Sequence, residues 1–285
     1  MSNNQPVFLT DCPRDAIQGM DKFIPTAKKI TYLNALIGSA LFDFIDFGSF
    51  VSAKAVPQLR DTEQVIESIE KSASTKLIAI IANERGASMG AGFKKIDYLG
   101  YPFSVSDTFQ RRNTNRSIEE SFTSVRAIKD ILDKSVGPEL MVYISMAFGN
   151  PYQDPWHEDI VLGWMERLKG LGVRKFSIAD TTSAATAEQI GILFNRIYAQ
   201  FSDLELSIHL HSDARGAAQK IEAAFQGGCR IFEGAVLGYG GCPFAQDELV
   251  GNIPSELLIH KFKSSQQYKV QSIITNFNDM IYDAV

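Results

Sequence analysis

Two histidines separated by a single residue, His209 and His211, are the side chains of this 285-residue chain whose spacing most directly indicates chemistry. The residues leading up to them, from Glu205, alternate in polarity and are rich in strand formers, which predicts an extended segment. Positions i and i+2 of an extended segment point to the same side, so both imidazoles can reach one metal ion. Because such a pair also occurs as the polar rim of a sheet, a metal site requires further ligands.

An acidic side chain with similar access follows a short apolar strand near the start of the chain. Residues 6–10 lead into Arg14 and Asp15. The Asp15 carboxylate can bind a cation, and the Arg14 guanidinium can hold a carboxylate or the oxygen of a developing enolate. A surface ion pair between a strand and a helix is the alternative. Combined with imidazole and amide donors, a carboxylate makes a ligand set that suits Mg²⁺ or Mn²⁺.

Short apolar segments alternate with amphipathic stretches along the chain, which favours a (β/α)₈ TIM barrel. The predicted strands are 7–9, 43–46, 77–81, 96–99, 141–145, 175–178, 206–209 and 230–233. The predicted helices include 21–38, 118–133, 159–170, 187–201 and 214–227. A doubly wound open sheet is the alternative fold. It is disfavoured because no glycine-rich dinucleotide loop follows the first strand.

A barrel of this kind brings polar residues from several strand ends to one face, where barrel chemistry is built. Arg14 and Asp15 follow the first predicted strand, and the two histidines end the seventh. The other polar side chains expected at this face are Asp46, Asn83, Ser145 and Asp180. The barrel hypothesis therefore turns scattered residues into one candidate site.

The length and composition fit one domain, 1–285, with a C-terminal helical extension of about 253–285. Hydrophobic residues make up 45% of the chain, enough to fill the core of a single barrel. The extension holds two predicted helices, 255–263 and 265–282. They are expected to cover the barrel or to contact a partner.

Charge and cysteine usage exclude several classes of protein. A net charge of −5 without long basic runs argues against nucleic acid and against an anionic membrane surface. Neither a signal-like start nor an apolar run of about 20 residues occurs in the sequence. Cys12, Cys229 and Cys242 form neither a disulfide framework nor a zinc motif. We therefore expect a cytoplasmic protein.

Five motifs in one order resemble those of hydroxymethylglutaryl-CoA lyase, a member of the DRE-TIM metallolyase superfamily. The motifs are Arg14-Asp15-x-Ile17-Gln18, Ser49-Phe50-Val51-Ser52-x-Lys54-x-Val56-Pro57-Gln58, Ser117-Ile118-Glu119-Glu120-Ser121-Phe122, His209-x-His211 and Gly240-Gly241-Cys242-Pro243-Phe244-Ala245-Gln246. They span most of the chain, from about Val7 to Asn252. By these motifs the chain is identified as a member of that family.

The resemblance implies a metal-dependent retro-Claisen cleavage of hydroxymethylglutaryl-CoA to acetyl-CoA and acetoacetate. The sequence leaves open whether the pathway is leucine breakdown or another. It implies that a divalent metal, Mg²⁺ or Mn²⁺, is held by Asp15, His209, His211 and Asn252. It also implies that Arg14 stabilises the enolate charge and that Cys242 is the catalytic thiol. Gln18 and Asp180 match other site residues of the family.

The base for the proton transfer and the residues of a subunit interface are assigned from the sequence itself. His209 is the candidate base for the substrate hydroxyl, with Asp46 or Asp180 as a relay. The resemblance implies a homodimer. The apolar residues near the end of the chain that are available for its interface are Ile273, Ile274, Phe277, Met280 and Ile281.

Coenzyme A needs cationic and polar contacts for its phosphates. Arg111 and Arg112 precede a predicted helix that opens with the capping box Ser117-x-x-Glu120, and Lys54 follows the second strand. A solvated basic loop is the alternative for the two arginines. The predicted substrate contacts are Gln18, Asn83, Ser145, Lys54, Arg111 and Arg112.

Departures from the family pattern bear on the substrate. The family's glutamate at the end of the second strand is Asp46 here, and the aspartate after the second histidine is displaced by one residue, to Asp213. The interval from Cys242 to Asn252 is also one residue longer. Alternative functions are therefore a related acyl-CoA lyase, an enzyme that condenses an acyl-CoA with a 2-oxo acid, or a barrel that binds metal without turnover. The chain lacks the long additional regions of such condensing enzymes, which favours a lyase.

Overall fold

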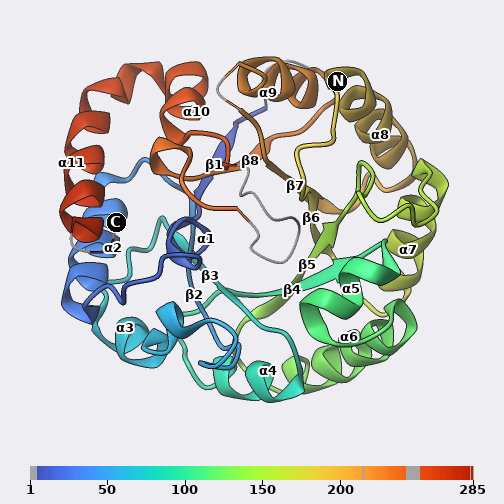
Figure 1. Ribbon diagram of the computed structural model, residues 1–285, viewed down its shortest axis with the longest axis horizontal. Helices are drawn as coiled ribbons and strands as arrows, with labels where there is room; N and C mark the ends of the chain where they lie inside the picture. Colours follow the sequence, from blue (N-terminus) through green and yellow to red (C-terminus); the bar gives the residue numbers. More distant parts are fainter. Residues whose placement is uncertain (1–4, 214, 242–250, 283, 285) are drawn as a thin grey trace.

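Eight parallel strands close into a barrel surrounded by helices, as Figure 1 shows along the barrel axis. The computed structural model describes residues 5–213, 215–241, 251–282 and 284. The strands are β1 (Phe8–Asp11), β2 (Phe44–Ser49), β3 (Lys76–Ile80), β4 (Tyr98–Ser104), β5 (Glu139–Ser145), β6 (Lys175–Asp180), β7 (Glu205–Leu210) and β8 (Ile231–Gly234). Each strand pairs with the next in the chain, and β8 pairs with β1. The predicted TIM barrel is therefore confirmed.

Helices lie between the strands and form the outer layer of the barrel (Figure 1). The five predicted helices correspond to α2 (Thr26–Ser39), α6 (Ile118–Leu132), α7 (Glu158–Gly170), α8 (Ala187–Gln200) and α9 (Ala217–Gln226). Shorter elements are α1 (Pro13–Ile17), η1 (Pro57–Leu59), α3 (Thr62–Ser68), α4 (Glu84–Gly90), α5 (Asp107–Thr114) and η2 (Val236–Gly238). These have too few turns to show an apolar repeat in the sequence. Within the part of the chain that the structure describes, no helix is long and apolar enough to cross a membrane.

The alternation of side chains along each strand divides the interior into two cores. The larger core lies between the strands and the helices. The smaller core lies inside the barrel and consists of Phe44, Ile78, Met141, Tyr143 and Ile231. A buried lysine at the start of β6, Lys175, pairs with Glu205 at the start of β7. Ser177, Ser207 and Glu233 also lie inside the barrel, where both serines donate to the glutamate. The polar cavity lies at the opposite end, where the strands finish.

The C-terminal extension consists of α10 (Ser255–Phe262), η3 (Ser264–Lys269) and α11 (Val270–Ile281). Helix α11 packs against α2, where the rings of Phe277 and Tyr32 lie 5.5 Å apart between centroids. Four of the five residues expected at a dimer interface are buried within the chain: Ile273, Phe277, Met280 and Ile281. The fifth, Ile274, packs partly buried against the same core. These side chains stabilise the fold of a single chain and do not offer a dimer interface.

Asp11, the last residue of β1, is a carboxyl group buried in the outer layer of the barrel. Ser255 of α10 donates a hydrogen bond to its Oδ1. Burial raises the pKa of Asp11 to about 7 from an ordinary value of 3.8, and the bond from Ser255 offsets this only in part. The folded state therefore binds this proton more tightly than the unfolded chain does. The contribution of Asp11 to stability falls as pH rises from about 4 to about 7.

We expect Asp11→Asn to raise the free energy of unfolding at pH 8 by about 2–4 kcal/mol, because the neutral amide removes a buried charge and still accepts from Ser255. At pH 4 the variant and the parent should be nearly equal, since the carboxyl group is then protonated. Urea unfolding followed by circular dichroism at both pH values measures the difference. Asp21→Asn, at an exposed position, is the control. A variant less stable than the parent at pH 8 would contradict the prediction.

Candidate active site

A cavity of about 130 Å³ opens at the C-terminal ends of the strands. Its apolar lining includes Val51, Val56, Ile80 and Phe109. Its polar lining consists of Arg14, Asp15, Gln18, Ser49, Asn113, Tyr143, Ser145, Thr181, His209 and His211. Six residues predicted for the site from sequence are among them. The cavity therefore combines an apolar wall with one concentrated set of polar groups.

Asp15, His209 and His211 form a compact buried group in this cavity. One donor atom of each residue lies within 4.8 Å of the others. Asp15 comes from α1, His209 from β7, and His211 directly follows that strand. Their shared side of the chain brings the two imidazole rings within 5.0 Å between centroids. A carboxylate and two imidazoles at such spacing can hold one divalent cation.

Asn252 reaches this group on a segment that runs beside the end of β7. It forms an antiparallel bridge with His211, and the next residue, Ile253, donates its N–H to the carbonyl of Leu210 at 3.2 Å. Asn252 Nδ2 donates to Asp15 Oδ2 at 2.6 Å. Its buried Oδ1 has no hydrogen-bond partner among the residues that the structure describes. A buried amide oxygen without a donor needs an explanation, and a cation supplies one.

Gly240 allows the close approach of these chains. Its φ of +102° lies in the region that favours glycine. A Cβ at this position would lie 2.6 Å from the carbonyl oxygen of Asp15 and 2.8 Å from Asn252 Nδ2. Any side chain here would therefore push apart two residues of the candidate metal group.

Arg14 is held in the cavity wall by two carboxylates. Its Nε and Nη2 donate to Asp46 Oδ2 at 3.0 and 2.6 Å, and its Nη1 donates to Asp15 Oδ1 at 3.0 Å. Burial tends to raise the pKa of Asp15, but Arg14 and the two histidines outweigh it and hold the pKa at about 2. For Asp46 the effect of burial is larger than that of Arg14, and its pKa is raised to about 6. Asp15 therefore stays ionised at neutral pH, whereas Asp46 is poised to exchange a proton.

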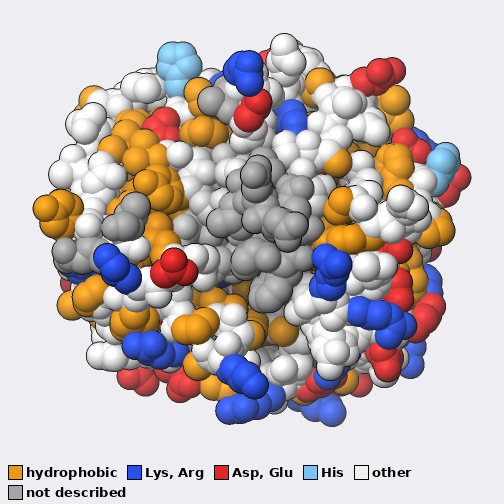
Figure 2. All heavy atoms as spheres, in the orientation of Figure 1, with side chains coloured by type: hydrophobic (Ala, Val, Ile, Leu, Met, Phe, Trp, Pro, Cys, Tyr) orange, Lys and Arg blue, Asp and Glu red, His pale blue; other side chains and the backbone are white. Residues whose placement is uncertain are grey.

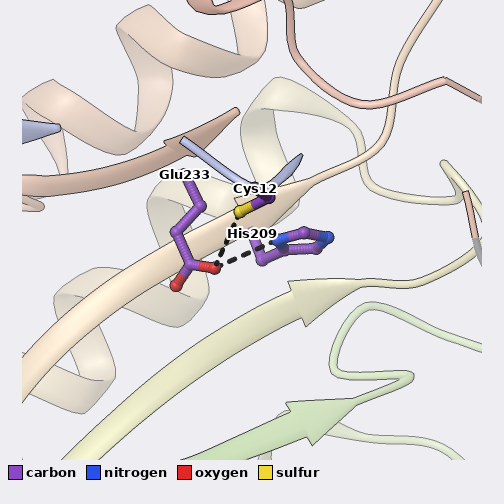
Figure 3. Close-up of side chains that lie close together, drawn as sticks. All are labelled: Cys12, His209 and Glu233. Carbon is purple, nitrogen blue, oxygen red and sulfur yellow. Dashed lines mark hydrogen bonds and ion pairs between the residues drawn. The ribbon is translucent and has the colours of Figure 1, made fainter. Parts of the chain in front are cut away.

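His209 is paired with Glu233 of β8, inside the barrel (Figure 3). Its Nδ1 lies 3.1 Å from Glu233 Oε2. Burial tends to lower the pKa of His209, but the bond and charge of Glu233 outweigh it, so the pKa is raised. Burial tends to raise the pKa of Glu233, but bonds from His209 and two serine hydroxyls outweigh it, so the pKa is lowered. The two side chains thus favour a charged or strongly polarised pair.

The residues present fit a divalent metal. Asp15 offers an ionised carboxylate, His209 and His211 offer imidazole nitrogens, and Asn252 offers a buried amide oxygen with no donor among the described residues. This mixture of nitrogen and oxygen donors suits Mg²⁺ or Mn²⁺ better than a thiophilic ion. The site thus has the composition of a divalent-metal centre beside a fixed arginine.

Comparison with known proteins decides the family. The model of the HMGL-like family matches residues 6–280. The chain belongs to the HMGL-like family. This agrees with the resemblance seen in the motifs and extends it to nearly the whole chain.

Similar members of this family include lyases from bacteria and vertebrates. Hydroxymethylglutaryl-CoA lyase of Bacillus subtilis is 30% identical over 251 residues, which cover 87% of this chain and 82% of the relative. The cytoplasmic 3-hydroxy-3-methylglutaryl-CoA lyase of Danio rerio is 31% identical over 250 residues, covering 87% and 73%. The structure of an HMG-CoA lyase from Acinetobacter baumannii, in complex with coenzyme A and 3-methylmalate, superposes with a TM-score of 0.88 at 27% identity. That match covers 97% of this chain and 91% of that one.

Asp46 is fully buried behind Arg14 and is not part of the cavity lining. Asp180 and Asn83 do not line the cavity either. Asp180 points toward the helices, where its Oδ2 accepts from Lys220 Nζ at 2.8 Å. The inward side chains of this strand end belong to Ala179 and Thr181. Asn83 caps α4, and its Oδ1 accepts from the backbone N–H of Gly86 at 2.9 Å. The structure therefore gives Asp180 and Asn83 local partners in place of the expected relay and substrate contact.

The three cationic residues expected to contact coenzyme A are exposed and lie outside the cavity lining. Arg111 pairs with Asp107 at 2.7 Å, Arg112 lies over the ring of Tyr152, and Lys54 is exposed. Figure 2 shows Lys and Arg side chains over α5 and α6, on the face where the barrel opens. A contact with substrate phosphates therefore stays a prediction. Cys242, the predicted catalytic thiol, lies outside the described residues.

Glu233, which contacts His209, and Tyr143, which lines the cavity, were not singled out in the sequence. Glu233 lies one residue before the end of its strand, in an otherwise apolar segment. A lone acidic residue in such a segment is a signal of a buried, functional carboxylate. Tyr143 has no comparable signal, because a tyrosine in a strand is ordinary.

We expect Asn83→Ala to lower the free energy of unfolding by about 1 kcal/mol, because it removes the N-cap of α4. Mn²⁺ affinity should stay unchanged. Asn83→Asp keeps the capping oxygen and should restore stability. Urea unfolding and calorimetric Mn²⁺ titration provide the two measurements. A parent-like unfolding curve together with weakened substrate binding would return Asn83 to the role of a substrate contact.

Proposed function

We propose that this protein is a divalent-metal-dependent lyase that cleaves hydroxymethylglutaryl-CoA to acetyl-CoA and acetoacetate. The observation that carries the proposal is the buried group of Asp15, His209 and His211 beside Arg14, at the mouth of a barrel of the HMGL-like family. Relatives that cover most of this chain are lyases of this substrate. Coenzyme A in the A. baumannii lyase supports an acyl-CoA as the substrate class.

The residues that would hold the metal are Asp15, His209, His211 and Asn252. A divalent ion bound there supplies Lewis acidity, which lowers the pKa of a substrate hydroxyl and draws charge from a neighbouring carbonyl. We propose Mg²⁺ or Mn²⁺ because one carboxylate and one amide oxygen make the donor set harder than a thiolate site. The remaining chemistry falls to side chains of the chain itself.

Arg14 is the group that stabilises negative charge as the carbon–carbon bond breaks. Cleavage between C2 and C3 leaves the bonding electrons on the thioester as an enolate, while the C3 hydroxyl becomes the ketone of acetoacetate. Two carboxylates fix the guanidinium before the substrate arrives, so little reorganisation is needed in the transition state. The same carboxylates keep Arg14 charged in a largely buried position.

Asp46 is the proposed acceptor for the proton of the C3 hydroxyl. Its Oδ2 is bonded to Arg14, while its Oδ1 has no hydrogen-bond partner among the described residues. A pKa of about 6 leaves it ionised and moderately basic at neutral pH. His209, the earlier candidate base, has one nitrogen committed to Glu233 and the other to the proposed metal group, which leaves it no free acceptor.

Cys242 is the proposed donor of the proton that converts the enolate to acetyl-CoA. The preceding glycines, Gly240 and Gly241, adopt backbone conformations that favour glycine and bring the chain beside Asp15 and Gln18. The acyl group would lie against the hydroxyl side chains of the cavity. Tyr143 supports this, because its buried hydroxyl has no hydrogen-bond partner among the described residues and can donate to a substrate oxygen.

Further parts of the proposal rest on the family resemblance and on composition. They are a homodimer, a cytoplasmic location and, as one candidate pathway, leucine breakdown. Burial of the apolar face of α11 within the chain means that any dimer would use another surface.

We expect the purified protein to release acetoacetate from hydroxymethylglutaryl-CoA when Mg²⁺ or Mn²⁺ is present and to stop when the metal is chelated. Cys242→Ala should lower kcat by at least about 100-fold, because it removes the proposed acid. A coupled acetoacetate assay measures both effects, and Cys229→Ala, at a buried cysteine outside the cavity lining, is the matched control. Bound Mn²⁺ without release of acetoacetate would contradict the proposed substrate.

We expect Asp46→Asn to lower kcat by about 100-fold or more while Mn²⁺ affinity stays within about twofold of the parent. In the parent, kcat should fall as pH drops through about 6, because protonated Asp46 can no longer accept a proton. Residual activity of the variant should lack this acid limb. Rate measurements between pH 5 and 8 test the prediction. An acid limb that persists in Asp46→Asn assigns the proton transfer to another group.

A further inference from the structure

We propose that Glu233 is a positioning residue whose carboxylate sets the tautomer and the ring orientation of His209. The Nε2 of His209 then presents its lone pair toward Asp15 and His211, the other two members of the buried group (the Asp15–His211 group). The inference rests on the metal site of the proposed function. It assigns a role to a residue of β8 that belongs neither to the proposed ligands Asp15, His209, His211 and Asn252 nor to the cavity lining.

Strand register places the two residues side by side. His209 and Glu233 are direct partners in the parallel pairing of β7 with β8. Both belong to the inward-facing positions, because the residues beside them, Leu210 and Phe232, pack in the outer core. Both side chains are buried, since Glu233 is 2% and His209 7% exposed. The pairing is therefore built into the sheet and does not depend on a loop.

The contact determines which nitrogen of His209 carries hydrogen. An ionised carboxylate only accepts hydrogen bonds, so Nδ1, at 3.1 Å from Glu233 Oε2, must be the donor. In a neutral imidazole the other nitrogen, Nε2, then keeps a free lone pair. Figure 3 shows this second nitrogen on the side of the ring that points away from Glu233. The same residue contributes a donor atom to the Asp15–His211 group.

Two hydroxyl groups hold the carboxylate in turn. Ser177 of β6 and Ser207 of β7 are partners in the sheet, and both donate to Glu233 Oε1 at 2.6 Å. With Oε1 committed to the serines, Oε2 faces the histidine, and Cys12 Sγ lies 4.0 Å from that oxygen. The side chain is thus held at both oxygens. Such an anchored partner is what fixes the orientation of a metal-binding histidine.

A purely structural ion pair in the core is the competing explanation. It would require only that opposite charges neutralise each other inside the barrel, and replacing Glu233 would then change stability without changing metal affinity. A positioning role predicts that replacing Glu233 weakens metal affinity. The amide of Glu233→Gln can donate to Nδ1 and so stabilise the tautomer whose Nε2 carries hydrogen, which cannot bind a metal.

The test is a titration of the whole chain with Mn²⁺, followed by electron paramagnetic resonance of the free ion. We expect Glu233→Gln to bind Mn²⁺ about 10- to 100-fold more weakly than the parent. Glu205→Gln is the matched control, because it also removes a glutamate from an ion pair of β7 but at the other end of the barrel. It should bind Mn²⁺ as the parent does. Mn²⁺ affinity of Glu233→Gln within about twofold of the parent overturns the inference.

A second variant covers the case in which Glu233→Gln does not fold. The double variant Ser177→Ala and Ser207→Ala keeps the carboxylate but removes both hydroxyl donors, and it should weaken Mn²⁺ binding by several fold. Nitrogen NMR of the histidine ring in the metal-free parent provides an independent readout. At a pH where the ring is neutral, hydrogen on Nδ1 of His209 supports the inference, and hydrogen on Nε2 overturns it.

These measurements separate the inference from the proposed substrate. Mn²⁺ binding that depends on Glu233, in a protein that releases no acetoacetate, supports the positioning role and refutes the substrate. Cleavage of hydroxymethylglutaryl-CoA with Mn²⁺ affinity independent of Glu233 supports the substrate and refutes the positioning role. A parent that binds no Mn²⁺ refutes both the metal site and the role of Glu233.

Discussion

The alternation of side chains on eight parallel strands is the constraint on which the rest of this structure depends. Each strand has one set of residues that faces the helices and one set that faces the barrel axis. An apolar inner core occupies the middle of the barrel. Ser177, Ser207 and Glu233 bond to one another inside the barrel, and the polar residues of the cavity collect at the strand ends, where α1 and the segment carrying Asn252 add to them.

Charges in such a narrow interior require partners, since an isolated buried charge is strongly disfavoured. Arg14 lies between Asp15 and Asp46, and His209 lies against Glu233. These pairings limit how far each side chain can turn. They also move pKa values apart, so that Asp15 and Asp46 share one arginine but differ in their readiness to take a proton. The same ion pairs thus neutralise the buried charges and prepare the side chains for chemistry.

Two residues predicted for the site from sequence, Asp180 and Asn83, lie outside the cavity lining for a related physical reason. Asp180 ends β6, as predicted. It lies two residues after Ile178, on the same side of the strand, and so points to the outer layer. Asn83 follows β3, as predicted, but its side chain caps the next helix, a use of asparagine that a strand end does not reveal. Position at the end of a strand is therefore insufficient. The direction of the side chain and the competition of nearby backbone donors decide whether a polar residue enters the cavity.

Sequence alone determined the barrel, all eight strands and the identity of the metal-ligand candidates, because these follow from apolar patterns and from ordered motifs that are local in the chain. Only the tertiary structure decided that Glu233 of β8 holds His209, that Asn252 lies against Asp15, and that the apolar face of α11 covers α2. The reason is that each of these contacts joins residues far apart in the chain. Their meeting depends on strand register and barrel closure, which no single segment encodes.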